Sequence, residues 1–133
     1  MSKIDLDKYY TNTETAKYCI NKTLDILNIL NISETIEPSA GNGSFSLQIP
    51  NCISYDIKPE HDSIIEQDFL NLDMEYKKGR LFIGNPPFGN RMNLAQKFFK
   101  KCIEYGDYVA FILPISQLKN TNSMFEFDLI LVS

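Results

Sequence analysis

The sequence contains only one histidine, His61, and its three cysteines stand far apart. A single histidine excludes every mechanism that requires a histidine pair. No Cys-x-x-Cys pair and no Cys/His metal spacing occurs around Cys19, Cys52 or Cys102. The sequence therefore supports neither a disulfide framework nor a zinc site, and we expect no metal. Unpaired cysteines are typical of a reducing compartment.

Long apolar runs are also missing from the chain. No stretch of about 18 apolar residues occurs, which excludes a membrane-spanning helix, and we expect no membrane partner. Residues 1–7 contain no apolar segment of the kind that a secretory signal has, so we expect an intracellular, cytoplasmic protein. A chain of 133 residues suits one domain with one hydrophobic core. We therefore expect a single domain over residues 1–133.

Acidic residues are absent from one part of the chain. Between Tyr76 and Lys101 there are seven basic residues and no acidic one, although the net charge of the protein is −4. A mostly acidic protein with one basic stretch can bring that stretch to a polyanion such as nucleic acid. A solvated surface face is the alternative explanation, and this feature alone leaves both open.

The chain does contain apolar strands that alternate with helical segments. Apolar residues recur at helical spacing from Thr13 to Leu30, after a Thr11/Glu14 pair that fits a capping box. A second helix is expected from Leu94 to about Tyr105, with Lys97, Lys100 and Lys101 on its polar face. Short strands are expected at residues 34–38, 52–57, 63–67, 81–84, 108–113 and 128–133. This alternation predicts an α/β fold with a mostly parallel sheet covered by helices.

Polar or glycine-rich clusters follow four of the expected strands. They are Glu37 to Gly43, Asp56, Asp68, and Asn85 to Phe88. Parallel sheets bind ligands at the carboxyl ends of their strands. We therefore expect the four clusters to form one site.

The first cluster is the segment from Glu37 to Phe45, Glu-Pro-Ser-Ala-Gly-Asn-Gly-Ser-Phe. Its Gly-x-Gly turn lets a ligand approach the backbone closely. The dinucleotide fingerprint has a third glycine, and Ser46 stands at that position here. A carboxylate at Glu37 repels a pyrophosphate but suits a cationic ligand such as S-adenosylmethionine. An ordinary glycine turn is the alternative.

Two further acids end strands. Asp56 follows Glu37 by nineteen residues, a spacing at which an acid accepts hydrogen bonds from ribose hydroxyls. Asp68 can accept a hydrogen bond from an adenine amino group, with Phe69 or Leu70 against the ring. Each acid taken alone is equally compatible with a simple turn.

Asn85, Pro86, Pro87 and Phe88 form the most specific cluster. The two prolines fix the backbone and remove two donors, while their carbonyls can still accept hydrogen bonds. The Asn85 side-chain oxygen and the Pro86 carbonyl can together accept both protons of a planar amine. This localises the nitrogen lone pair, so that the amine becomes a nucleophile. Phe88 can stack on a flipped base; a rigid Pro-Pro turn is the alternative.

These segments resemble known motifs. Glu37 to Phe45 resembles motif I, and Asn85 to Phe88 motif IV, of the S-adenosylmethionine-dependent amino-methyltransferases. With Lys8-Tyr-Tyr-Thr11 before them, the order is similar to the gamma group of N6-adenine DNA methyltransferases. The chain is also similar to small adenine-methylase-like proteins of large DNA viruses. The resemblance covers residues 8–117.

The resemblance implies a Rossmann-like S-adenosylmethionine-dependent methyltransferase fold and methylation of the adenine exocyclic amine, in DNA in preference to RNA. Nucleic acid is then the expected partner. The implied catalytic residues are Asn85, Pro86, Pro87 and Phe88. The implied cofactor-binding residues are Tyr10, Thr11, Glu37, Ala40, Gly41, Gly43, Asp56, Asp68 and Phe69.

Two departures from the family pattern keep alternatives open. Phe88 stands where DNA-acting members often have Tyr, so RNA is a second substrate class. Only residues 128–133 remain for the C-terminal hairpin, so we expect an incomplete hairpin, no target-recognition domain, and a protein partner that completes the sheet edge. Alternative functions are methylation of a glutamine amide in protein, which uses the same Asn-Pro-Pro clamp, and a truncated, non-catalytic cofactor-binding or interaction subunit.

Overall fold

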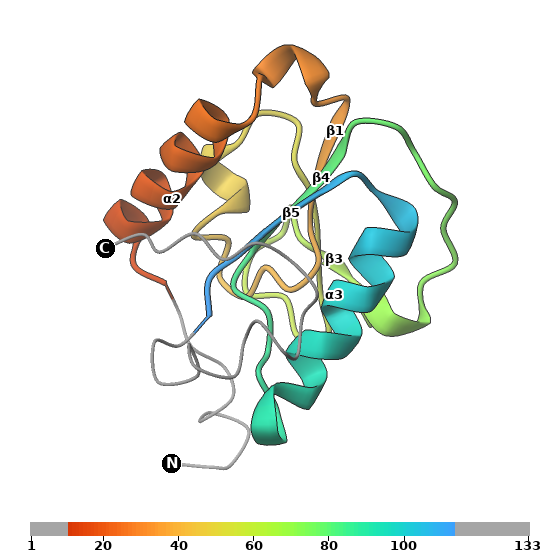
Figure 1. The fold of residues 1–133 in the computed structure, drawn as a ribbon. Coiled ribbons are helices and arrows are strands. Elements are labelled where there is room, and N and C mark those ends of the chain that lie inside the picture. The colour runs from red at the N-terminus through yellow and green to blue at the C-terminus, as the bar shows by residue number, and fades with distance from the viewer. Residues whose placement is uncertain (1–10, 114–133) are drawn as a thin grey trace.

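The computed structural model describes residues 11–113, which form a five-stranded, all-parallel sheet in the order β3-β2-β1-β4-β5 (Figure 1). The strands are β1 (Glu34–Glu37), β2 (Ile53–Asp56), β3 (Ile65–Glu66), β4 (Arg80–Gly84) and β5 (Tyr108–Phe111). The predicted α/β class with parallel strands is confirmed. The strand predicted at 128–133 and the expected hairpin lie outside the described residues, and so does Tyr10.

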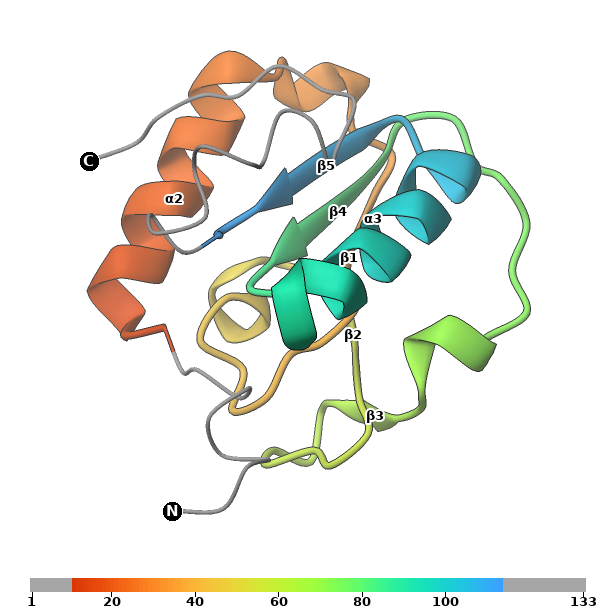
Figure 2. The ribbon, with the colours of Figure 1, turned by 60° about the horizontal axis from the view of Figure 1, so that its bottom comes forward.

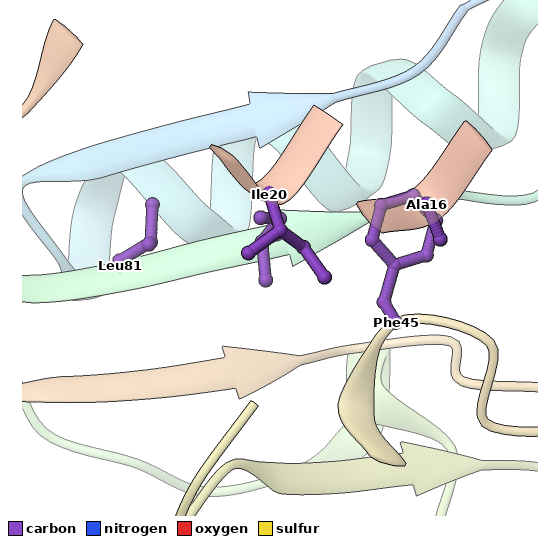
Figure 3. Packing of buried hydrophobic residues seen from close by; sticks show 5 residues of the cluster. Ala16, Ile20, Phe45 and Leu81 are labelled. Atoms are coloured by element: carbon purple, nitrogen blue, oxygen red, sulfur yellow. The ribbon is translucent and has the colours of Figure 1, made fainter. Parts of the chain in front are cut away.

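Two helices cover opposite faces of the sheet (Figure 2). These are α2 (Thr13–Ile26) and α3 (Asn93–Tyr105). Successive side chains of a strand point to opposite faces, and β4 follows this rule. Its Leu81 and Ile83 belong to the cluster that contains Ala16 and Ile20 of α2 (Figure 3). Phe82 belongs to the other cluster, with Phe98 and Cys102 of α3.

The order of the strands creates a topological switch point between β1 and β4. From β1 the chain proceeds outward to β2 and β3, and then returns to β4 on the other side of β1. The loops that leave β1 and β4 therefore run in opposite directions from adjacent strands. Open parallel sheets bind ligands at such a point, outside the carboxyl ends of the strands.

Helix α2 begins at the predicted Thr13, but its capping residue and its C-terminal end differ from the prediction. Asn12, and not Thr11, caps it: the Asn12 side-chain oxygen accepts a hydrogen bond from the Thr15 N–H at 2.8 Å. The helix ends at Ile26, short of the predicted Leu30. The Asn28 side chain accepts from the Leu30 N–H at 2.9 Å and so caps a separate 3₁₀ turn, η1 (Ile29–Asn31). Asparagine competes for backbone N–H groups in this way, which the apolar periodicity does not register.

Three more 3₁₀ turns connect the main elements. They are η2 (Ser46–Gln48), η3 (Phe69–Asn71) and η4 (Asn90–Met92). Among residues 11–113, β5 pairs with β4 alone. Within the same residues, no helix is long and apolar enough to cross a membrane.

Candidate functional site

A cavity of about 360 Å³ opens at the carboxyl edge of the sheet. The segments that follow β1, β2, β3 and β4 all contribute to its lining, as the positions of the four clusters predicted. The predicted site residues that line it are Thr11, Glu37, Ala40, Gly41, Asp56, Asp68, Phe69, Asn85, Pro86 and Pro87. Elements distant in the sequence therefore converge on one hollow at the switch point.

Of the predicted site residues that the structure describes, Gly43 and Phe88 do not line this cavity. Gly43 closes the turn after β1: its N–H donates to the Ala40 carbonyl at 2.8 Å, and its φ is +88°. A Cβ there would lie 2.7 Å from the Leu47 Cγ atom, so this glycine shapes the loop. Phe88 packs against the cluster of Met92 and Ala95.

The backbone of Phe88 has a structural role at the start of α3. Its carbonyl accepts hydrogen bonds from the Leu94 and Ala95 N–H groups, at 3.1 and 3.4 Å. Helix N-termini need acceptors for their first N–H groups. The Asn-Pro-Pro-Phe segment is thereby joined to α3, and Leu94 and Phe98 of that helix line the cavity.

Glu37 lies at the end of β1 and is 2% exposed. Its Oε1 atom accepts a hydrogen bond from the Ser46 N–H at 3.0 Å. Its Oε2 atom lies 2.7 Å from the place that a Cβ of Gly84 would occupy, so the absent side chain at the end of β4 makes room for this carboxyl. Burial raises the pKa of Glu37 to about 8, because a buried carboxylate loses its hydration.

Asp56 ties the loop after β1 to the loop after β2. Its Oδ2 atom accepts from the Gly41 N–H and its Oδ1 atom from the Lys58 N–H, both at 2.8 Å. The Ala40 N–H donates to the Tyr55 carbonyl at 2.8 Å. The carboxyl that was predicted to hold a ribose therefore also organises the glycine-rich turn beside it.

We expect Asp56→Ala to weaken the binding of a nucleoside-containing ligand by more than tenfold and to lower the free energy of unfolding by about 1–3 kcal/mol. The Gly41 and Lys58 N–H groups would both lose their acceptor, and an unsatisfied buried donor costs about this much. Calorimetric titration and urea unfolding measure the two effects. Asp62→Ala, at an exposed residue, is the matched control. Unchanged affinity in a folded Asp56→Ala protein would contradict the role of Asp56 in binding.

Asn85 begins the loop that leaves β4. Its Nδ2 group donates a hydrogen bond to the Thr11 Oγ1 atom at 3.1 Å, which orients the plane of the side-chain amide. Pro86 and Pro87 follow it along the cavity wall. The contact with Thr11 joins the first described residue to the end of β4, a connection that no sequence spacing indicates.

Asp68 and Phe69 form the wall that follows β3. The Asp68 oxygens accept from the Leu70 N–H and the Asn71 Nδ2 group, at 3.0 and 3.1 Å. Phe69 is 1% exposed and stacks on Phe98, with ring centroids 5.5 Å apart. Both Phe69 and Leu70 line the cavity, but Phe69 is also a core residue, whereas Leu70 is half-buried.

Lys101, predicted on the polar face of the second helix, holds this wall in place. Its Nζ atom donates to the carbonyls of Phe69 and Leu72, at 2.6 and 2.5 Å, and lies 5.0 Å from the centroid of the Phe69 ring. Lys97 and Lys100 are exposed, as predicted. Only two of the three lysines therefore face the solvent fully.

The basic stretch is divided between two ends of the sheet. Arg80 is buried at the start of β4 and forms an ion pair with Glu34 at 2.7 Å, and Lys77 approaches the same carboxylate at 3.6 Å. This end of β4 is opposite to the cavity. Arg91 follows the Asn-Pro-Pro-Phe segment and is exposed, whereas the exposed Lys97 and Lys100 of α3 lie beside the segment from Leu70 to Asp73.

Several lining residues were missed by the sequence analysis. Leu94 and Phe98 follow helical spacing and were assigned to the apolar core face, where a cavity wall and a core give the same pattern. Gly84 does not line the cavity, and in the sequence it is marked only by its place before Asn85. The space that it leaves for the Glu37 carboxyl becomes visible only when β1 and β4 are adjacent.

Comparisons of the chain with protein-family models, with curated proteins and with solved structures found no match. Among residues 11–113, no group of three or more His, Cys, Asp or Glu side chains could hold a metal ion. The functional assignment therefore depends on the chemistry of the cavity itself.

Proposed function

We propose that this protein is an S-adenosylmethionine-dependent methyltransferase of Rossmann-like fold that methylates the exocyclic amine of adenine in nucleic acid, with DNA preferred to RNA. One observation carries the proposal: a single cavity at the switch point contains the buried Glu37, the strand-ending Asp56 and the Asn85-Pro-Pro segment. The two carboxyl groups suit a cationic nucleoside, and the Asn85-Pro-Pro segment suits a planar amine.

The loops after β1, β2 and β3 suit the cofactor. The backbone around Ala40 and Gly41 and the carboxyl of Glu37 would hold the methionine part, with Asp56 at the ribose and Asp68 at the adenine. S-Adenosylmethionine supplies an electrophilic methyl group when bound. No cation of the described residues forms an ion pair with Glu37, so the donor set fits a positively charged ligand.

The segment after β4 suits the substrate. An amide oxygen at Asn85 and the carbonyl of Pro86 can accept the two protons of an adenine amine and draw its lone pair out of the ring. Such preorganised acceptors stabilise the charge that develops in a transition state. The contact between Asn85 and Thr11 holds the amide in one orientation before a substrate arrives.

Exposed cations of the α3 region support a nucleic acid partner. Arg91, Lys97 and Lys100 are exposed, and α3 also lines the cavity through Leu94 and Phe98. Phosphate contacts position a nucleic acid and weaken with salt. We expect the double variant Lys97→Ala/Lys100→Ala to raise the KM for nucleic acid by about tenfold at moderate salt and to leave cofactor affinity unchanged.

The matched control is Lys22→Ala, at an exposed lysine of α2. Salt titration of the KM distinguishes the two variants, because each lost phosphate contact reduces the slope of log affinity against log salt by about 0.7–0.9. An unchanged salt slope in the double variant would show that these lysines only solvate the helix.

Methylation of a glutamine amide is the second candidate, and the position of Phe88 favours it. Its side chain packs against Met92 and Ala95 and does not line the cavity, so the aromatic surface for a flipped base is not displayed there. An amide needs the Asn-Pro-Pro clamp but has no extended ring to stack.

Calorimetric titration with S-adenosylmethionine, followed by transfer of a labelled methyl group to DNA, RNA and glutamine-containing peptides, tests the proposal. We expect saturable binding and label in adenine. Label in peptide alone would establish the second candidate. Binding without transfer to any substrate would indicate the non-catalytic subunit, and no binding by the folded chain would overturn the proposal.

A further inference from the structure

Glu37 is a buried carboxyl group in the cavity, and within the described part of the chain it has no counter-cation. It is 2% exposed, its Oε1 atom accepts one hydrogen bond from the Ser46 N–H, and its Oε2 atom lies over Gly84. No Lys, Arg or His of residues 11–113 forms an ion pair with it. An ionised carboxylate in such a place is costly, and an isolated buried acid binds a proton instead.

The neighbouring carboxyl group of Asp56 increases this cost. Asp56 is 6% exposed in the same cavity and adds a repulsive charge. Cys52 is half-buried beside Glu37, and burial together with this carboxyl raises the pKa of its thiol to about 12, so the thiol stays neutral. Lys58 and Asp68 line the cavity from the loops after β2 and β3. The inner end of the cavity therefore favours a positive charge beside Glu37, where no cation of residues 11–113 forms an ion pair.

We infer that the cavity exchanges a proton for its ligand: Glu37 is protonated when the cavity is empty, and a cationic ligand enters as this proton leaves. The inference rests on the proposed function, because it takes S-adenosylmethionine as the cation. The balance is one ligand bound, one Glu37 carboxylate formed and one proton released to the solvent. Glu37 thereby selects the ligand by its charge.

The sign of the pH dependence follows from this exchange. Burial raises the pKa of Glu37 to about 8 in the empty cavity, and a bound cation lowers it. Between the pKa of Glu37 in the bound protein and its pKa in the empty protein, the fraction of empty molecules with an ionised Glu37 rises by about tenfold per pH unit. Ligand affinity rises with pH by the same factor. The ligand's own charges are constant between pH 5.5 and 7, because its amino group titrates near 8 and its carboxyl group near 3.5.

Calorimetric titration in two buffers of different ionisation enthalpy measures the protons released. For the wild-type protein with S-adenosylmethionine at pH 6.5, we expect about one proton per ligand and an affinity that rises about tenfold per pH unit. Glu37→Gln should abolish both effects. Glu66→Gln, at an exposed residue of β3, should retain them. The uncharged thioether 5′-methylthioadenosine should bind without proton release.

The outcomes separate this inference from the proposed function. Binding of S-adenosylmethionine with no proton release and constant affinity from pH 5.5 to 7 would overturn the inference and leave the methyltransferase proposal standing. Absence of binding for both nucleosides would overturn the proposed function and the inference with it. If Glu37→Gln fails to fold, the contrast between the two nucleosides on the wild-type protein decides the question.

Discussion

Replacement of Asn85 by alanine is expected to slow methyl transfer by about 10²–10³-fold, the typical cost of removing one preorganised hydrogen-bonding group from an active site. The side chain is held by Thr11 at the mouth of the loop after β4. Because the role proposed for Asn85 is to hold the substrate amine and not the cofactor, the affinity for S-adenosylmethionine should change little. Single-turnover rates with labelled cofactor, together with calorimetric titration, measure the two quantities.

The variant Thr11→Val tests whether the orientation of the Asn85 side-chain amide affects the rate. Valine is close to threonine in size but has no hydroxyl to accept from Asn85, so the amide plane is no longer fixed. We expect a smaller loss of rate, about tenfold, with unchanged stability. Loss of cofactor binding in a folded Asn85→Ala protein would show that Asn85 belongs to the cofactor half of the cavity.

Phe69→Ala should lower the free energy of unfolding by about 3–5 kcal/mol, as the removal of a buried aromatic ring typically does. The ring is 1% exposed, packs edge-to-face on Phe82 and stacks on Phe98. A small domain has only about 5–15 kcal/mol of stability in total. Urea unfolding followed by circular dichroism should therefore show a much lower midpoint.

Phe69→Leu serves as the matched control, since it retains an apolar side chain of moderate volume and should cost less. The sequence assigned Phe69 to the adenine ring, and the two roles predict different results. A core residue affects stability first, while a stacking residue affects affinity first. An unchanged midpoint with abolished nucleoside binding would restore the adenine assignment.

The local pattern of the sequence determined the elements and the edge at which the site lies. Apolar runs such as Leu81 to Ile83 are buried on both faces and indicate parallel strands without knowledge of the fold. The carboxyl ends of parallel strands meet at one edge, so Glu37, Asp56 and Asn85 could be placed together from their positions after strands. The function that was predicted for them stays a prediction.

Tertiary structure alone decided which chemically similar side chains face the cavity. Phe69 and Phe88 are both aromatic residues in the sequence, but the first packs in the core and contributes to the cavity lining, whereas the second packs on Met92 away from it. Lys100 and Lys101 are adjacent, yet of these two only Lys101 reaches the carbonyls of Phe69 and Leu72. These outcomes depend on contacts between elements far apart in the chain, and no local spacing encodes them.

Contacts between elements far apart in the chain also decide where the basic residues lie and how deeply Glu37 is buried. The seven basic residues between Tyr76 and Lys101 stand on both sides of β4 in the sequence. Arg80 lies at the start of this strand, and Arg91 follows its carboxyl end. The sequence shows that Glu37 is an acid next to a glycine-rich turn. The packing of β1 against β4 buries its carboxyl, and no cation of residues 11–113 pairs with it. The proposed exchange of its proton for a ligand rests on this burial.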